Sequence, residues 1–186
     1  MDEIVLLFAK LIILTMKKVF LSLITLLYSF TAMALTLNFG SLECLKGQKN
    51  IVVSLDLTNT TYMSNYTVEE FLNKAPRSKN WKEGSIRQFV TEFNEKTNKI
   101  GLKVVDEGET EYELQIVPGN INSAGEFVKV EVNVLKKSTN ELMASMTLDT
   151  DDGDKNDEIA FRDTMGELGE RLGSFFNLKL KKINNK

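Results

Sequence analysis

Acidic side chains are densest between residues 149 and 158, where they could hold a divalent cation. Clustered carboxylates suit hard cations such as calcium, and the first six residues of the segment offer four of them: Asp149, Asp151, Asp152 and Asp154. The spacing does not fit an EF-hand loop, because with Gly153 at position 6 the ligand positions 1 and 12 fall on Leu148 and Ile159. The segment is therefore either a solvated turn whose last acids favour the start of a helix, or an irregular cation site.

A second group of side chains combines positive charge with an aromatic ring. Trp81, the only tryptophan, has four basic residues around it in the sequence: Lys74, Arg77, Lys79 and Lys82. An aromatic ring beside positive charge can face an anionic partner, which makes Trp81 a candidate interaction residue. The alternative is structural, with Trp81 plugging the edge between a sheet and a helix.

Paired carboxylates could carry out acid–base chemistry, as they do in glycosidases. Asp56 ends an apolar segment, and Glu69 and Glu70 follow in the next helical one. Thr67 and Glu70, however, have the spacing of a capping box, in which the Glu70 side chain bonds the start of the helix. We therefore expect no catalytic residue among them.

The composition removes most other catalytic and metal chemistry. The 186-residue chain has no histidine, which excludes Ser-His-Asp and Cys-His catalysis and histidine-ligated zinc. Cys44 is the single cysteine, so a disulfide can form only between two chains. A net charge of -3 does not favour nucleic acid, and no glycine-rich nucleotide loop occurs. We expect neither a cofactor nor an enzymatic activity.

Residues 1–34 have the pattern of a signal peptide. Met16 and two lysines form a basic start, residues 19–34 carry no charge, and Ala32 and Ala34 form a small-x-small cleavage site. Translation is therefore expected to start at Met16. A retained membrane anchor is the alternative, but the apolar run of about 16 residues is shorter than the roughly 20 that cross a bilayer. We expect an exported protein, periplasmic or secreted, without a stable membrane span after processing.

Hydrophobic periodicity predicts one α+β domain over residues 35–186. Apolar residues alternate in five segments, which predicts strands at 51–57, 102–105, 112–116, 128–134 and 142–148. A short helix follows Thr67, and a long amphipathic one runs from Asn80 to a stop at Gly101. The last helix spans about 156–182. The order β-α-α-β-β-β-β-α predicts a two-layer sandwich with a mixed sheet and the two main helices on one face.

Three glycines lie along one flank of the last helix: Gly166, Gly169 and Gly173. Each costs a helix roughly 1 kcal/mol, which close approach of the helix backbone to a neighbour would offset. That neighbour is a sheet, a helix of the same chain or a second chain. The flank is therefore a candidate interaction surface, and a homo-oligomer is one outcome.

Two segments resemble small secreted proteins of unknown function from Bacteroidetes-type bacteria. The first is Leu37-Asn38-Phe39-Gly40-Ser41-Leu42 with Leu45-Lys46-Gly47-Gln48, and the second runs from Gly166 to Phe176. The expected strand order also resembles the amino-terminal domain of TolB and related cell-envelope accessory domains. The resemblance implies an α+β sandwich that acts by protein contact, and it implies no catalytic residue.

The sequence thus predicts a non-enzymatic accessory protein of the periplasm or cell envelope. Its expected partner is an envelope protein or assembly, and not nucleic acid. The alternative is a domain that binds a ligand or divalent cation through the acidic segment 149–158.

Overall fold

Alternating apolar residues build a six-stranded mixed sheet. A computed structural model describes residues 35–68, 70–71, 81–127, 129–149 and 158–185. The strands are β1 (Thr36–Gly40), β2 (Asn50–Leu55), β5 (Lys103–Val105), β6 (Tyr112–Pro118), β8 (Lys129–Lys136) and β9 (Glu141–Asp149). They are arranged in the order β1-β9-β8-β6-β2-β5.

The pairing of these strands confirms the mixed character of the sheet. β6, β8 and β9 form an antiparallel meander, and β1 pairs antiparallel with β9 at one edge. β2 runs parallel to both of its neighbours, β5 and β6. The meander follows from the short turns between its strands, whereas parallel pairing requires the long connection that α3 (Trp81–Thr97) supplies between β2 and β5.

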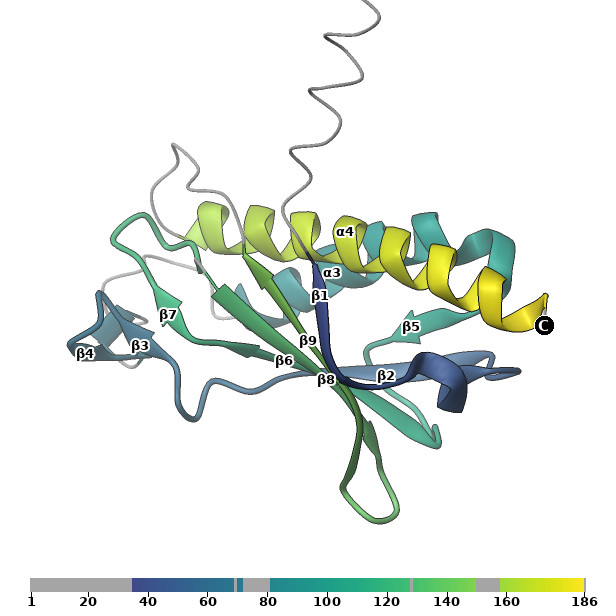
Figure 1. Cartoon of the computed structure of the whole chain (residues 1–186). Helices are drawn as coiled ribbons and strands as arrows, with labels where there is room; N and C mark the ends of the chain where they lie inside the picture. The colour runs from purple at the N-terminus through teal and green to yellow at the C-terminus, as the bar shows by residue number, and fades with distance from the viewer. Residues whose placement is uncertain (1–34, 69, 72–80, 128, 150–157, 186) are drawn as a thin grey trace, which may run out of the picture. The chain divides into compact units, whose positions relative to one another are not determined.

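One face of the sheet carries the core. Every second residue of the long strands points to this face and is buried, as in Ile51-x-Val53-x-Leu55 of β2 and Val130-x-Val132-x-Val134 of β8. Figure 1 shows α3 and α4 (Glu158–Asn184) together on one side of the sheet. The predicted α+β two-layer sandwich is confirmed.

The two main helices pack against each other through the glycine flank of α4. A Cβ built on Gly169 would lie 2.5 Å from the carbonyl oxygen of Phe89, and one on Gly173 would lie 2.7 Å from that of Phe93. A Cβ on Gly166 would lie 2.9 Å from the Cγ of Gln88. All three glycines are buried, so this flank contacts α3 of the same chain.

The predicted core residues of α3 and the predicted stop after this helix are confirmed as well. Phe89 and Phe93 are fully buried, and after η2 (Asn98–Ile100) the chain turns at Gly101, whose φ of 74° favours glycine. Asn94 then ties α3 to the sheet: its amide nitrogen donates to the Val104 carbonyl (2.9 Å) and its amide oxygen accepts from the Val104 N–H (2.8 Å).

The structure also contains short elements that periodicity does not predict. β1 and η1 (Leu42–Leu45) precede the expected first strand. A second sheet, in the order β4-β3-β7, is built from β3 (Thr61–Tyr62), β4 (Tyr66–Thr67) and β7 (Asn120–Ile121). Two residues are too few to establish an alternation, so these strands are defined only by their pairing, which is local between β3 and β4 and distant between β3 and β7.

Adding a methyl group at the helix crossing tests the close packing. Gly169→Ala is expected to destabilise the protein by about 2 kcal/mol, because the new Cβ overlaps the backbone of α3 and overpacking outweighs the gain in helix propensity. The measurement is urea unfolding followed by circular dichroism.

Gly84→Ala is the matched control. Gly84 lies in α3 with no atom within 4 Å of a built Cβ, so this variant should gain about 0.5–1 kcal/mol from propensity alone. Equal stability of Gly169→Ala and the natural chain would contradict the packing account.

Candidate functional site

An open hollow lies where the chain leaves β2. Its volume is about 830 Å³, within the range of small-molecule and peptide sites. Leu55 at the end of β2 and residues 56–61 line it, together with Tyr66, Trp81 and Lys82. It therefore brings together Asp56, Trp81 and Lys82, which the sequence singled out in separate groups.

Hydrogen bonds fix the rim formed by residues 55–61. The Asp56 N–H donates to the Ile116 carbonyl (2.9 Å), which extends the pairing of β2 with β6. The Asp56 carboxylate accepts from the Thr58 N–H (2.9 Å) and closes a turn. The hydroxyl of buried Thr60 donates to the Pro118 carbonyl (2.6 Å). The rim is thus held in place before anything binds.

The environment of Asp56 favours its charged form. Hydrogen bonds from Thr58 are the main cause that lowers the pKa of Asp56, and the positive charge of Lys82 contributes less. The Gln115 amide also donates to this carboxylate (3.2 Å). A carboxyl group with a lowered pKa is a poor general acid near neutral pH.

Two acids could pair with Asp56: Glu70, which caps a helix instead, and Glu69. The Thr67 N–H donates to the Glu70 carboxylate (2.7 Å), and the Glu70 N–H donates back to the Thr67 hydroxyl (3.4 Å). This confirms the predicted capping box. Glu69 is not among the described residues.

An aromatic cluster supports the Trp81 side of the hollow. The Trp81 ring meets Phe161 of α4 edge-on at a centroid distance of 4.9 Å, and Phe71 edge-on at 6.3 Å. Phe71 in turn contacts Tyr62, which contacts Tyr66. Half-buried Trp81 therefore packs where α3 and α4 begin and still borders the hollow. Lys74, Arg77 and Lys79 lie outside the described residues.

The hairpin between β3 and β4 holds its tip in an uncommon backbone conformation. Met63 and Ser64 have positive φ values of 49° and 62°, which cost non-glycine residues roughly 1–2 kcal/mol each. The Ser64 N–H donates to the Asn120 side chain (2.8 Å) and the Met63 N–H to the Ile121 carbonyl (2.7 Å). Met63 and Tyr66 are nevertheless 43% exposed. The sequence did not reveal this tip, because it lacks the glycine or Asn-Gly that marks such turns.

The acidic segment is described only at its first residue. Asp149 ends β9, and its carbonyl accepts from Arg171 (3.1 Å). Asp151, Asp152 and Asp154 lie outside the described residues, so the cation site stays a prediction. Elsewhere in the described chain, no group of three or more acidic or cysteine side chains is placed to hold a metal ion.

The export signal also lies outside the described part of the chain. This applies to residues 1–34 as a whole, including Met16 and the cleavage residues Ala32 and Ala34. Within the described ranges, no helix has the length and hydropathy needed to cross a membrane.

Cys44 of η1 is half-buried, and burial raises the pKa of its thiol.

Comparisons with known proteins give only distant structural similarities. No protein-family model and no curated protein matches the chain. Among solved structures, the PelC dodecamer from Paraburkholderia phytofirmans superposes with a TM-score of 0.40 and 9% identity, covering 74% of this chain and 97% of PelC. A DUF330 protein from Xanthomonas campestris gives 0.40 and 11%, covering 83% and 98%. Similarity this low supports no conclusion about function or assembly.

The charge of Asp56 should contribute to stability in a pH-dependent way. The folded-state pKa lies below the unfolded value near 3.9, so the stabilisation is complete above that value and is lost as the pH falls through the folded pKa. Asp56→Asn should therefore be less stable than the natural chain at pH 7, by less than about 1 kcal/mol because the group is solvent-screened, and the difference should shrink near pH 2.

Thermal unfolding of both proteins at the two pH values measures this difference. Asp106→Asn, at an exposed loop position, controls for a general change in net charge. An identical loss for Asp56→Asn at both pH values would assign the effect to hydrogen-bond geometry instead of charge.

Proposed function

We propose that this protein is an exported, non-enzymatic domain of the periplasm or cell envelope that acts by binding another protein. Its binding surface is the hollow beside Trp81 together with the β3–β4 hairpin. The export pattern of residues 1–34 supports the location. The resemblance of two segments to small secreted proteins, and of the strand order to TolB amino-terminal domains, supports the same choice.

The hairpin tip is the observation that carries this proposal. Two consecutive non-glycine residues hold positive φ, and Met63 exposes a large apolar side chain there. Backbone strain of this kind persists where surrounding structure enforces it, and it clusters at sites of binding and catalysis. A glycine would relieve the strain at no cost to the core, and the exposed side chain of Met63 is available for a contact with a partner.

The chemistry of the hollow favours binding over catalysis. Residues 55–61 offer backbone groups and threonine hydroxyls, Trp81 and Tyr66 offer their rings, and Asp56 is the one acid among the described residues that line the hollow. Asp56 has its hydrogen bonds satisfied and a lowered pKa, so it suits a fixed acceptor or charge partner. An aromatic surface with adaptable polar groups around it is typical of protein interfaces.

The partner is expected to contribute an extended segment with an apolar anchor. β4 is the outer strand of its small sheet, and outer strands can receive an added strand through main-chain hydrogen bonds. An apolar side chain of that segment would lie against Tyr66 and Trp81. The Lys82 ammonium next to Trp81 would favour an acidic residue beside the anchor.

Site-specific crosslinking tests the proposed surface. A photo-reactive amino acid at position 66 should give a discrete adduct with one envelope protein in cells that express the full chain. The same group at Lys137, on the exposed β8–β9 turn, should not give that adduct. The absence of any specific adduct at position 66 would contradict the proposal.

Glycine substitutions at the tip separate strain from contact. Met63→Gly is expected to raise the free energy of unfolding by up to about 1 kcal/mol, because it relieves backbone strain. It should also lower the crosslinking yield at least tenfold, because the Met63 side chain no longer contacts the partner. Ser64→Gly relieves the same kind of strain but keeps Met63, so it should retain crosslinking. Stability is measured by urea unfolding; full crosslinking in Met63→Gly would exclude the tip from the interface.

A further inference from the structure

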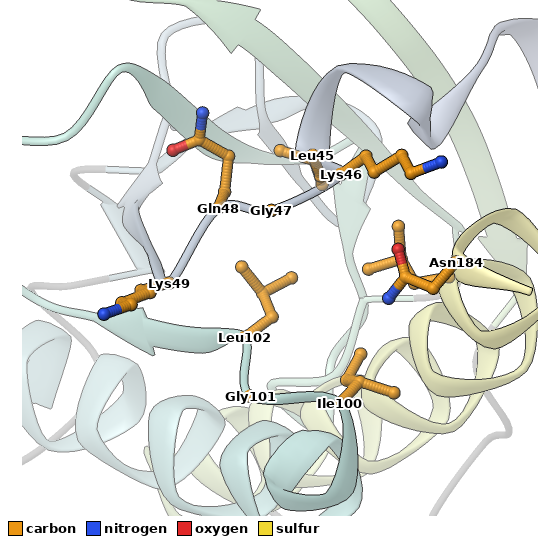
Figure 2. A pocket seen from close by; sticks show the side chains of 10 residues that line it. Leu45, Lys46, Gly47, Gln48, Lys49, Ile100, Gly101, Leu102 and Asn184 are labelled. Carbon is orange, nitrogen blue, oxygen red and sulfur yellow. The ribbon is translucent and has the colours of Figure 1, made fainter.

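A second hollow lies near the carboxyl ends of the two main helices. Its volume is about 480 Å³. Three segments surround it: residues 45–49 between η1 and β2, residues 100–102 after α3, and the last turns of α4 at Leu180 and Asn184. Figure 2 shows Leu102 in the middle of the hollow, with Gln48 and Asn184 on different sides of it.

The floor of this hollow is apolar. Leu45, Leu102 and Leu180 are 2–3% exposed and belong to the core, and Ile100 is half-buried against it. Gly47 and Gly101 turn the chain at the mouth, and a Cβ on either one would meet no atom within 4 Å. The mouth is therefore open to solvent, and Ile100 is the most exposed of the aliphatic side chains beneath it.

The rim of the hollow is positively charged although the chain as a whole is acidic. Lys46 and Lys49 line it, and none of the lining residues in the described part of the chain is acidic. In Figure 2 these two side chains lie on different sides, with their ammonium groups turned away from Leu102. Three more exposed lysines directly adjoin lining residues in the sequence: Lys99, Lys103 and Lys181.

Glu111, whose carboxylate contacts the rim residue Gln48, is already paired. Glu111 accepts a hydrogen bond from Gln48 (2.9 Å) and lies 4.0 Å from the Lys136 ammonium. The carboxyl end of α4 adds partial negative charge, which Lys181 and Lys182 in its last turn offset. The exposed lysines on the rim are thus available to an anion that comes from solution.

We propose that this hollow binds an anionic amphiphile, a carboxylate or phosphate monoester on a short aliphatic chain. The chain would lie against half-buried Ile100, where it removes apolar surface from water, with the almost fully covered Leu102 beneath it. The head group would stay at the rim, where Lys46 and Lys49 reach it by rotating their flexible stems and the Gln48 and Asn184 amides offer neutral donors. The size of the hollow is that of ordinary small-ligand sites, about 300–1,000 Å³.

Methyl NMR of the full chain tests this site directly. Octanoate and octyl phosphate, below their micelle concentrations, should shift the methyl signals of Ile100 and Leu102 in a saturable way. The response of the two ligands shows which head group is preferred. Hexanoate should bind about fifteenfold more weakly than octanoate, because it is two methylenes shorter and each methylene contributes about fourfold. Acetate and octyltrimethylammonium should leave these signals unchanged.

Variants that remove the charge of the two rim lysines test whether these residues bind the head group. Lys46→Ala combined with Lys49→Ala should weaken binding about tenfold at low salt, and added salt should weaken it in the natural chain. The control removes two exposed lysines elsewhere, Lys129→Ala with Lys137→Ala, and should bind as before.

Three results would overturn the site. They are no saturable shift at Ile100 or Leu102, equal binding of octyltrimethylammonium, or an equal loss of binding in the control pair. Because the hollow beside Trp81 shares no residue with this one, crosslinking at position 66 and amphiphile binding succeed or fail separately.

Discussion

The close contact between α3 and α4 is the constraint on which the rest of the structure depends. Gly169 and Gly173 let the α4 backbone reach that of α3, and the Lys96–Glu170 ion pair lies at the same crossing. Since Trp81 meets Phe161 at one end, and Ile100 and Leu180 line one hollow at the other, the two helices run side by side in the same direction. A wider separation would uncover the sheet between them and disturb both hollows.

The two edge strands of the sheet, β5 and β1, differ in how far they are protected from pairing with another strand. At the β5 edge, the Asn94 side chain occupies both the N–H and the carbonyl of Val104, so these groups are not available to another strand. At the other edge, β1 is largely exposed and includes Phe39, which is 55% exposed. The Asn94 side chain thus protects the edge beside the parallel strands. The edge beside the antiparallel meander is formed by β1, a short strand with an irregular register.

Periodic segments could be predicted from the sequence, and segments defined by distant pairing could not. The alternation in β6, β8 and β9 and the stripe that buries Phe89 and Phe93 each repeat often enough to establish a period. The capping box of Thr67 and Glu70 is local, so its residues alone indicate it. β3, β4 and β7 have two residues each, too few for a period, and the small sheet is completed only where Thr61 and Tyr62 of β3 pair with β7 far along the chain. The sequence likewise showed that the glycine flank needs a close neighbour, but not that the neighbour is α3.

The candidate sites follow the same division between local and distant information. Asp56, Trp81 and Lys82 stood out by residue type, whereas the hollow that unites them depends on how the chain leaves β2 and enters α3. The lysine-rimmed hollow was harder to foresee, because it joins three segments and its lysines are ordinary surface residues when taken singly. One pair of parallel helices places an aromatic surface at the amino-terminal end and a basic mouth at the carboxyl-terminal end. The helix dipoles favour cations at the carboxyl-terminal ends of α3 and α4. The lysines there therefore stabilise the helices even with no ligand bound. The same positive charges would attract an anion to the hollow.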